Sequence, residues 1–171
     1  MITVLRIGHR IDRDKRITTH VALVARAFGA DNIFIDTKDK KIEETVRSIC
    51  GRFGGNFKIE TGVDRKKIIK DWAGTVVHLT MYGERLEKSI NLINKSKDLL
   101  IIVGAEKVPP EIYEMADFNI SVGNQPHSEV AALSIFLDRY TNGLWQKKKF
   151  TKGKIEILPC NKGKKVISKE K

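Results

Sequence analysis

The sequence predicts an α/β fold: a parallel sheet with helices on both faces. Short apolar segments of strand length alternate along the chain with longer amphipathic segments of helical length. Strands separated by helices of this length pair in parallel, and the helices then cover both faces of the sheet. The 171 residues suit one domain of ordinary size with a short appendage. A hydrophobic content of 41% is enough for a core and excludes a largely disordered chain.

Each expected element follows from its local pattern. Strands are expected where short runs are rich in β-branched and aliphatic residues, at residues 2–7, 32–36, 57–60, 75–80, 99–103 and 118–122. Helices are expected where apolar residues recur at helical spacing, at residues 19–28, 42–53, 64–72, 84–94 and 128–140, with a short helix begun by Pro109 and Pro110. Asp64 is expected to cap the third helix, and Asn142 and Gly143 to end the last one.

The chain after Gly143 differs from the rest in charge and pattern. Residues 144–171 hold ten lysines against Glu156 and Glu170, a net charge of +8, whereas residues 1–143 carry 22 basic and 19 acidic side chains, a net charge of +3. Residues 154–159 and 164–168 read as two strands joined by a turn at residues 161–163. We therefore expect a main domain at residues 1–143 and a basic C-terminal β-hairpin extension at residues 144–171. A clustered basic segment favours a nucleic acid partner, with a solvating tail as the alternative.

Several classes of protein are disfavoured. No apolar run approaches the ~20 residues that a membrane helix needs, and residues 1–8 lack a secretory pattern, so we expect a cytoplasmic protein. Cys50 and Cys160 lie far apart and are expected as reduced thiols. The chain has no G-x-G-x-x-G after a strand, no P-loop, no G-x-S-x-G around Ser128, and no metal-ligand spacing among its four histidines. These absences argue against a dehydrogenase, an NTPase, an α/β-hydrolase and a zinc enzyme.

Polar segments that contain glycine follow three consecutive strands. They span residues 78–83, 104–109 and 123–129. Ligands of parallel α/β sheets bind at the carboxyl ends of the strands, and glycine lets the backbone approach a ligand closely. One such segment would be an ordinary turn, but three in succession predict a shared pocket.

Residues 8–20 form a fourth cluster, rich in arginine, between the first strand and the first helix. Thr18 or Thr19 is expected to cap that helix. Arginines beside a helix N-terminus suit a phosphate or a ribose backbone. The alternative is a solvated loop in which Asp12 and Asp14 pair with neighbouring arginines.

These segments together resemble a known family. The motifs GHR-x-x-RD-x-R-x-TTH, HLTMYG, VGAEKVP and VGNQPHSEVAALSIFLDR are similar to those of the archaeal tRNA cytidine 2′-O-methyltransferases of the SPOUT superfamily. The similarity runs along the whole chain, and VGNQPHSEVA is its most specific part. The resemblance implies S-adenosylmethionine as the methyl donor, a trefoil knot, a homodimer, a tRNA substrate and no metal.

The resemblance also implies a set of site residues. The expected cofactor-binding residues are Leu79, Gly104, Ala105, Glu106, Lys107, Val108, Val122, Gly123, Asn124, Gln125, Pro126, His127, Ser128 and Glu129. Many SPOUT ribose methyltransferases carry an asparagine and an arginine at a set distance before the glycine that ends the first helix. Counted back from Gly29, the residues at those positions are apolar or cannot be matched, and the nearest arginines are Arg16 and Arg26. We assign the catalytic role to Arg16, because an arginine at the position of Arg26 usually faces solvent.

The reaction that the resemblance implies moves a methyl group to a ribose 2′-hydroxyl of tRNA, at the T-loop cytidine of tRNA position 56. Arg16 would position the adjacent phosphate and stabilise negative charge that develops on the oxygen, since arginine stays protonated. Two alternatives remain open. One is an RNA-binding α/β module without catalysis, and the other is a SPOUT enzyme that methylates a base.

Overall fold

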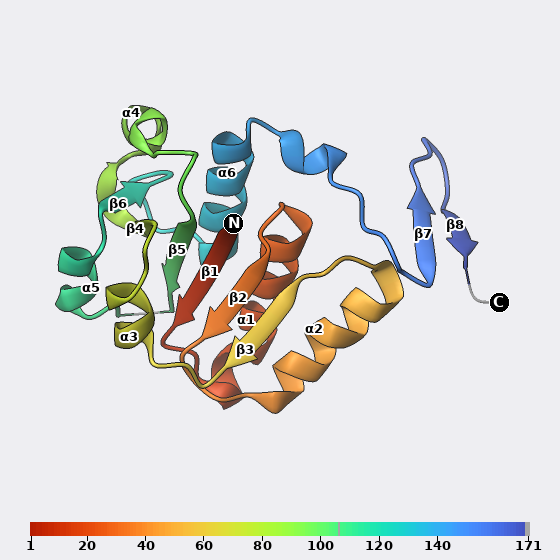
Figure 1. Cartoon of the computed structure of the whole chain (residues 1–171), viewed down its shortest axis with the longest axis horizontal. Coiled ribbons are helices and arrows are strands. Elements are labelled where there is room, and N and C mark those ends of the chain that lie inside the picture. Colours follow the sequence, from red (N-terminus) through yellow and green to blue (C-terminus); the bar gives the residue numbers. More distant parts are fainter. Residues whose placement is uncertain (106, 170–171) are drawn as a thin grey trace.

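The computed structural model describes residues 1–105 and 107–169. Its main feature is a six-stranded sheet in the order β3-β2-β1-β5-β4-β6 (Figure 1). Every neighbouring pair in this sheet is parallel, which confirms the predicted parallel sheet. The strands are β1 (Ile2–Ile7), β2 (Asn32–Ile35), β3 (Lys58–Thr61), β4 (Thr75–Arg85), β5 (Leu99–Gly104) and β6 (Phe118–Ser121).

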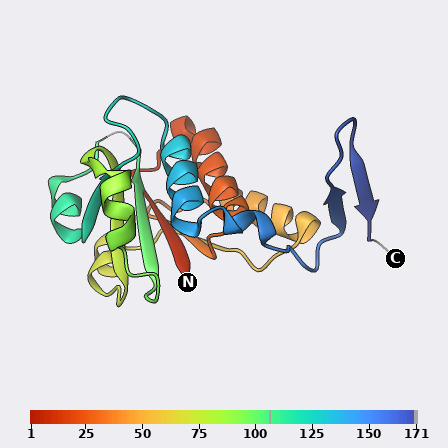
Figure 2. The ribbon, with the colours of Figure 1, turned by 90° about the horizontal axis from the view of Figure 1, so that it is seen from above.

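Helices cover both faces of the sheet. The larger core lies beneath α1 (Ile11–Ala27), α2 (Lys40–Phe53) and α6 (Glu129–Thr141), and the smaller one beneath α3 (Arg65–Lys70) and α5 (Pro110–Met115). Helices α1 and α6 lie side by side (Figure 2). The central strand β5 is apolar throughout because both of its faces are buried: Leu99, Ile101 and Val103 join the larger core, while Leu100 and Ile102 join the smaller one.

Side-chain caps fix where several helices begin. The carboxylate of Asp64 accepts hydrogen bonds from the backbone N–H groups of Lys66 (3.0 Å) and Lys67 (3.1 Å), as predicted. Helix α6 ends at Asn142 and Gly143, both in left-handed conformations (φ 51° and 70°), and this confirms the predicted stop.

The first helix begins eight residues earlier than predicted, so the cap expected at Thr18 or Thr19 is wrong. Its buried face contains Asp14 and Thr18 before the apolar stripe starts at Val21. Those polar residues hide the helical periodicity in the sequence, since only apolar positions signal a buried face. The hydroxyl of Thr18 instead lies 2.9 Å from the ring Nδ1 of His9, and the hydroxyl of Thr19 donates to the carbonyl of Lys15.

The fourth strand runs further than predicted and shortens the helix expected at residues 84–94. Strand β4 shifts register between Leu79 and Glu84, pairs with β6 on both sides of this irregularity, and ends at Arg85. Gly83 is required there, because a Cβ atom would meet the carbonyl oxygen of Asn119 at 2.5 Å. Only α4 (Leu86–Ser89) and the 3₁₀ helix η1 (Ile90–Leu92) remain of the expected helix.

The C-terminal segment docks on the main domain and then leaves it. After the 3₁₀ helix η2 (Leu144–Lys147), strands β7 (Ile155–Leu158) and β8 (Lys165–Ser168) form a separate antiparallel sheet that projects from the body (Figure 2). The connecting segment is anchored, because Trp145 stacks on Phe28 with ring centroids 4.2 Å apart. Glu170 and Lys171, which belong to the expected extension, lie outside the described residues.

Two further expectations concern cysteines and membranes. Cys50 and Cys160 are both free thiols, as expected. In the part of the chain that the structure describes, no helix has the length and apolar character to cross a membrane.

Candidate active site

A cavity of about 700 Å³ lies at the carboxyl ends of β4 and β5, next to the start of α6. Its volume is typical of small-molecule sites. All three strand-exit segments of the sequence analysis contribute to its wall, so the structure brings them together in one place. The expected cofactor-binding residues in the wall are Leu79, Gly104, Ala105, Lys107, Val108, Pro126, His127 and Glu129.

Five other expected cofactor-binding residues do not line this cavity. Val122, Gly123, Asn124 and Gln125 border a separate hollow beside Arg85. The amide of Asn124 donates to the carbonyl oxygens of Met81 (2.8 Å) and Gly83 (3.3 Å), so it holds the irregular part of β4 that borders the cavity. The hydroxyl of Ser128 accepts from the backbone N–H of Val130 and caps α6. Glu106 lies outside the described residues.

Nine wall residues were not among the expected cofactor-binding residues, although five of them belong to the predicted strand-exit segments. Those five are His78, Thr80, Met81, Tyr82 and Pro109, and the other four are Val103, Pro110, Tyr113 and Ala132. Tyr113 reaches the cavity from α5, and its hydroxyl lies 3.2 Å from that of Thr80. A sequence pattern assigns a residue of a short helix to a face, but it does not show which strand end that face meets.

His78 is fully buried in β4. Its ring Nδ1 lies 2.8 Å from Oδ1 of Asn119, and the ring packs edge-on against Tyr113 at a centroid distance of 4.7 Å. Burial lowers the pKa of His78, and the hydrogen bond to Asn119 opposes this only in part. The imidazole is therefore neutral at pH 7.

Arg6 holds one wall residue of the cavity in place from within the core. Its side chain is fully buried in β1, and its Nη2 donates to Oε1 of Glu129 at 2.7 Å. Burial lowers the pKa of Arg6, and the carboxylate of Glu129 opposes that shift. A single charged residue, Arg6, in the mostly aliphatic strand ITVLRI was the sequence signal for this pair, because a charged residue in a buried strand needs a partner.

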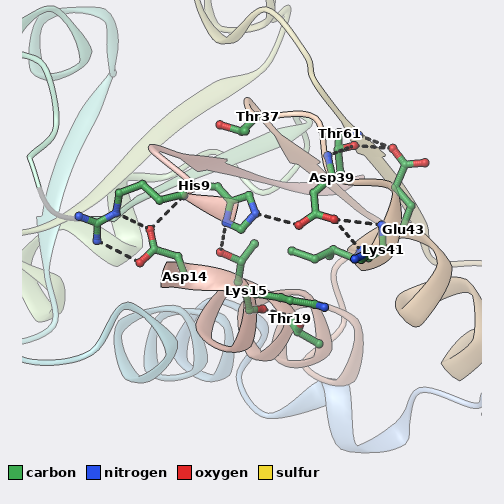
Figure 3. Close-up of polar contacts among 12 residues, drawn as sticks. His9, Asp14, Lys15, Thr19, Thr37, Asp39, Lys41, Glu43 and Thr61 are labelled. Atoms are coloured by element: carbon green, nitrogen blue, oxygen red, sulfur yellow. Dashed lines mark hydrogen bonds and ion pairs between the residues drawn. The ribbon is translucent and has the colours of Figure 1, made fainter. Parts of the chain in front are cut away.

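A second polar network lies at the same edge of the sheet, around His9 (Figure 3). The His9 ring is buried between Thr18 and Asp39. Its Nδ1 lies 2.9 Å from the hydroxyl of Thr18, and its Nε2 lies 3.2 Å from a carboxylate oxygen of Asp39. Asp39 caps α2 through the N–H groups of Lys41 and Ile42, and its own N–H donates to the hydroxyl of Thr61. The network therefore ties the start of α1 to the ends of β2 and β3.

The arginines of the first cluster differ in their partners. Arg10 forms a two-pronged ion pair with Asp14, from Nε at 2.8 Å and Nη2 at 3.0 Å, and these hydrogen bonds lower the pKa of Asp14 to about 2. The alternative of an internal Arg–Asp pair therefore holds for Asp14. Arg16 is exposed on α1 and does not line the cavity of its own chain.

Arg26 does not face solvent, contrary to the expectation. Its side chain is 8% exposed, and its Nη2 donates to the carbonyl oxygen of Gly54 at 2.6 Å. Its guanidinium lies over the ring of Phe150, 4.4 Å from the centroid. Arg26 therefore anchors the C-terminal segment. The sequence analysis preferred Arg16 because it expected Arg26 to face solvent, and the structure contradicts that reason.

The resemblance implied no metal site. Within residues 1–105 and 107–169, no group of three or more histidine, cysteine, aspartate or glutamate side chains is placed to hold a metal ion.

The fold has close counterparts among solved structures. The SpoU methyltransferase AviRb from Streptomyces viridochromogenes, solved with AdoMet, gives a TM-score of 0.59 at 11% identity over 83% of this chain and 57% of that one. The TrmH/SpoU tRNA modifying enzyme of A. aeolicus gives 0.61 at 15% identity over 85% and 76%. The chain therefore has the SPOUT methyltransferase fold, as predicted.

Sequence comparison identifies the family. Residues 53–167 match the family model described as tRNA ribose 2′-O-methyltransferase, aTrm56. The tRNA (cytidine(56)-2′-O)-methyltransferase of Thermococcus kodakarensis is 55% identical over 99% of this chain and 98% of that protein. The protein of the same name from Picrophilus torridus is 60% identical over 96% of this chain, which spans about half (48%) of that longer relative. The chain belongs to the tRNA ribose 2′-O-methyltransferase family, and this confirms the resemblance.

Proposed function

We propose that this protein transfers the methyl group of S-adenosylmethionine to the ribose 2′-hydroxyl of the cytidine at tRNA position 56. The observation that carries the proposal is the 55% identity, over nearly the full length of both chains, to the Thermococcus kodakarensis protein of that name. Family membership favours catalysis over an inert RNA-binding module. It also favours the ribose over a base as the methylated group.

The cavity fits the cofactor. S-adenosylmethionine combines a flat nucleoside with a zwitterionic amino acid, and small-molecule sites of this kind are mostly apolar with a few polar groups. Val103, Val108 and Ala132 supply apolar wall, while Lys107 and Glu129 supply opposite charges for the carboxylate and the ammonium group. We propose that the backbone of residues 104, 105, 107, 108 and 126–129 contributes further hydrogen bonds. Residues 122–125 border the separate hollow, and Glu106 lies outside the described part of the chain.

The reaction needs little from the protein beyond alignment and charge stabilisation. The bound cofactor supplies an electrophilic methyl group on a positively charged sulfur. The ribose hydroxyl is a poor nucleophile at neutral pH, so a base must take its proton as it attacks. Its oxygen must lie in line with the methyl group and the sulfur, because the sulfur leaves as the thioether of S-adenosylhomocysteine. Arg16 is free to bind the phosphate beside that ribose and to stabilise the developing negative charge.

We further propose a homodimer. Arg16 does not line the cavity of its own chain, so an arrangement in which the cavity borders a second subunit would allow Arg16 of one subunit to serve the cavity of the other. The trefoil knot and a cytoplasmic location belong to the same proposal, since both come with the family.

The basic extension is proposed to bind tRNA phosphates. Lys162, Lys164 and Lys165 are exposed around the β7–β8 turn, and lysine acts as a point charge toward phosphate. Lys148 is not available for this role, because its ammonium group donates to the carbonyl oxygen of Gly29 at 2.9 Å. Part of the extension is therefore structural and part is free for RNA.

The deciding experiment measures methyl transfer from labelled cofactor to tRNA, followed by nuclease digestion to nucleosides. We expect the label in 2′-O-methylcytidine, and no label in a tRNA whose position 56 carries a 2′-deoxyribose. Label in a base-methylated nucleoside would make the chain a base methyltransferase. Tight tRNA binding without any label would leave it an RNA-binding module.

A further inference from the structure

His78 lines the cavity, and one nitrogen of its buried ring has no hydrogen-bond partner in the part of the chain that the structure describes. It is Nε2 of His78, a side chain with 0% exposure. Native proteins pair nearly all such buried atoms with protein, water or ligand. An unpaired nitrogen on a residue that lines a ligand cavity therefore needs an explanation.

Asn119 determines which ring nitrogen carries the proton. The amide nitrogen of Asn119 donates to the carbonyl oxygen of Tyr113 at 2.9 Å, so its Oδ1 faces His78 and accepts from Nδ1–H at 2.8 Å. A neutral imidazole with its proton on Nδ1 presents Nε2 as a pure acceptor. Burial keeps the ring neutral by lowering its pKa. His78 therefore offers a lone pair and no proton at this position.

The apolar part of the wall, to which His78 and Tyr113 contribute, matches one half of the cofactor better than the other. The ring packs edge-on against Tyr113, and Val108, Pro109 and Pro110 add apolar wall. Flat apolar surfaces suit a nucleoside. The charged amino acid end of the cofactor has Lys107 and Glu129, the charged side chains among the described wall residues, as partners.

We propose that His78 binds the nucleoside half of S-adenosylmethionine, its Nε2 accepting a hydrogen bond from the adenine amino group or from a ribose hydroxyl. The inference rests on the proposed function, since it concerns the same cavity. It adds a specificity role: a neutral acceptor at this point favours adenosine over nucleosides that lack the matching donor, because binding them would leave Nε2 buried without a partner.

Calorimetry with S-adenosylhomocysteine tests the proposal without turnover. His78→Phe keeps the ring packing and removes the acceptor, and we expect its affinity to fall about 3- to 10-fold, as for the loss of one hydrogen bond. S-inosylhomocysteine lacks the amino donor, and the 2′- and 3′-deoxy analogues each lack one hydroxyl. The analogue without the donor that meets Nε2 should bind the wild type and His78→Phe equally well. Equal weakening of all four ligands would overturn the proposal, because it would indicate a general distortion of the cavity.

A second measurement covers the case of a variant that folds poorly. In ¹⁵N-labelled wild-type protein, the His78 Nε2 resonance should start at the position of an unprotonated ring nitrogen and shift when S-adenosylhomocysteine binds. An unchanged resonance would show that the ligand does not reach this nitrogen, which overturns the proposal. A wild-type protein without affinity for S-adenosylhomocysteine would overturn the proposed function as well, whereas normal wild-type binding with unchanged His78→Phe affinity would overturn only the role of His78.

Discussion

At the scale of single residues, buried polar side chains at the carboxyl edge of the sheet hold the groups that the reaction needs. Asp14 accepts from Arg10 and Glu129 accepts from Arg6, so two of the arginines near the site are committed to carboxylates. Arg16 is exposed on α1 and is not committed in this way. A substrate phosphate can therefore bind it without breaking an existing pair.

Replacing Arg16 by alanine is expected to slow methyl transfer by on the order of 10²-fold or more, as for other groups that stabilise developing charge. The affinity for S-adenosylmethionine should change little, because Arg16 does not line the cavity of its own chain. Single-turnover kinetics and calorimetry measure the two quantities. Arg13→Ala, at another exposed arginine of α1, is the matched control. Normal turnover of Arg16→Ala would refute the assignment.

Glu43 should make stability depend on pH. Hydrogen bonds from Lys38 and then from Thr61 lower the pKa of its carboxyl from 4.5 to about 2. Because the folded pKa is the lower one, this stabilisation is complete above pH 4.5 and is lost as the pH falls toward 2. Glu43→Gln should cost about 1–3 kcal/mol at pH 7. Denaturant unfolding should show this difference narrow with acidification, and a constant difference from pH 7 to 2 would contradict the assignment.

At the scale of elements, apolar periodicity predicted the strands and most helices, and failed where burial is polar. The first half of α1 was missed because Asp14 and Thr18 occupy its buried face. Arg6 was missed as a site-forming residue, and His78 was placed in a pocket segment without a role of its own, for a related reason. Their roles depend on Asn119 and Glu129, partners 41 and 123 residues away, which only the assembled sheet brings near. The strand-exit segments were predictable because parallel topology alone brings them to one edge.

The packing of the loop after β5 restricts substitutions at Gly104. A Cβ atom at Gly104 would collide with a methyl group of Val108, which lines the cavity. Gly104→Ala should therefore displace Val108 and lower the affinity for S-adenosylmethionine about tenfold or more, through overpacking rather than direct contact with the ligand. Gly51→Ala is the control, because its Cβ meets nothing within 4 Å. Undiminished affinity of Gly104→Ala in calorimetry would contradict this view of the loop.

The role of the extension in tRNA binding is best tested by removing its charges rather than by deleting its residues. Removing everything after Gly143 would also remove the stacking of Trp145 on Phe28, and so would destabilise the domain. The double change Lys162→Gln and Lys164→Gln keeps the hairpin. We expect it to weaken tRNA binding and to reduce the log–log salt slope by roughly 0.7–0.9 for each phosphate that the variant no longer neutralises.

The matched control for the extension is Lys70→Gln with Lys97→Gln, which removes the same charge from exposed positions that precede β4 and β5. It should leave the salt slope nearly unchanged. An equal slope for the wild type and the hairpin variant would assign the extension a structural role alone. A lower melting temperature of the hairpin variant would also indicate a structural role.

At the scale of the whole molecule, few apolar residues of α6 are available for a dimer interface. Leu133, Phe136 and Leu137 are fully buried within their own chain. Ile135, on the same helix, stays 44% exposed, and Ile11 is exposed on the neighbouring helix α1. An interface along α1 and α6 would cover both side chains and would lie next to Arg16.

Light scattering at micromolar concentration should therefore report about twice the 19.4 kDa of one chain. Ile135→Asp should shift the mass toward the monomer, because a carboxylate buried in an apolar interface is strongly unfavourable. Ile135→Val keeps the surface apolar and should leave the dimer intact. If Arg16 serves the cavity of the partner subunit, the monomeric variant should lose methyl transfer while it stays folded. A wild-type mass near 19 kDa would refute the dimer, and full activity of a monomeric Ile135→Asp protein would show that one chain holds the complete site.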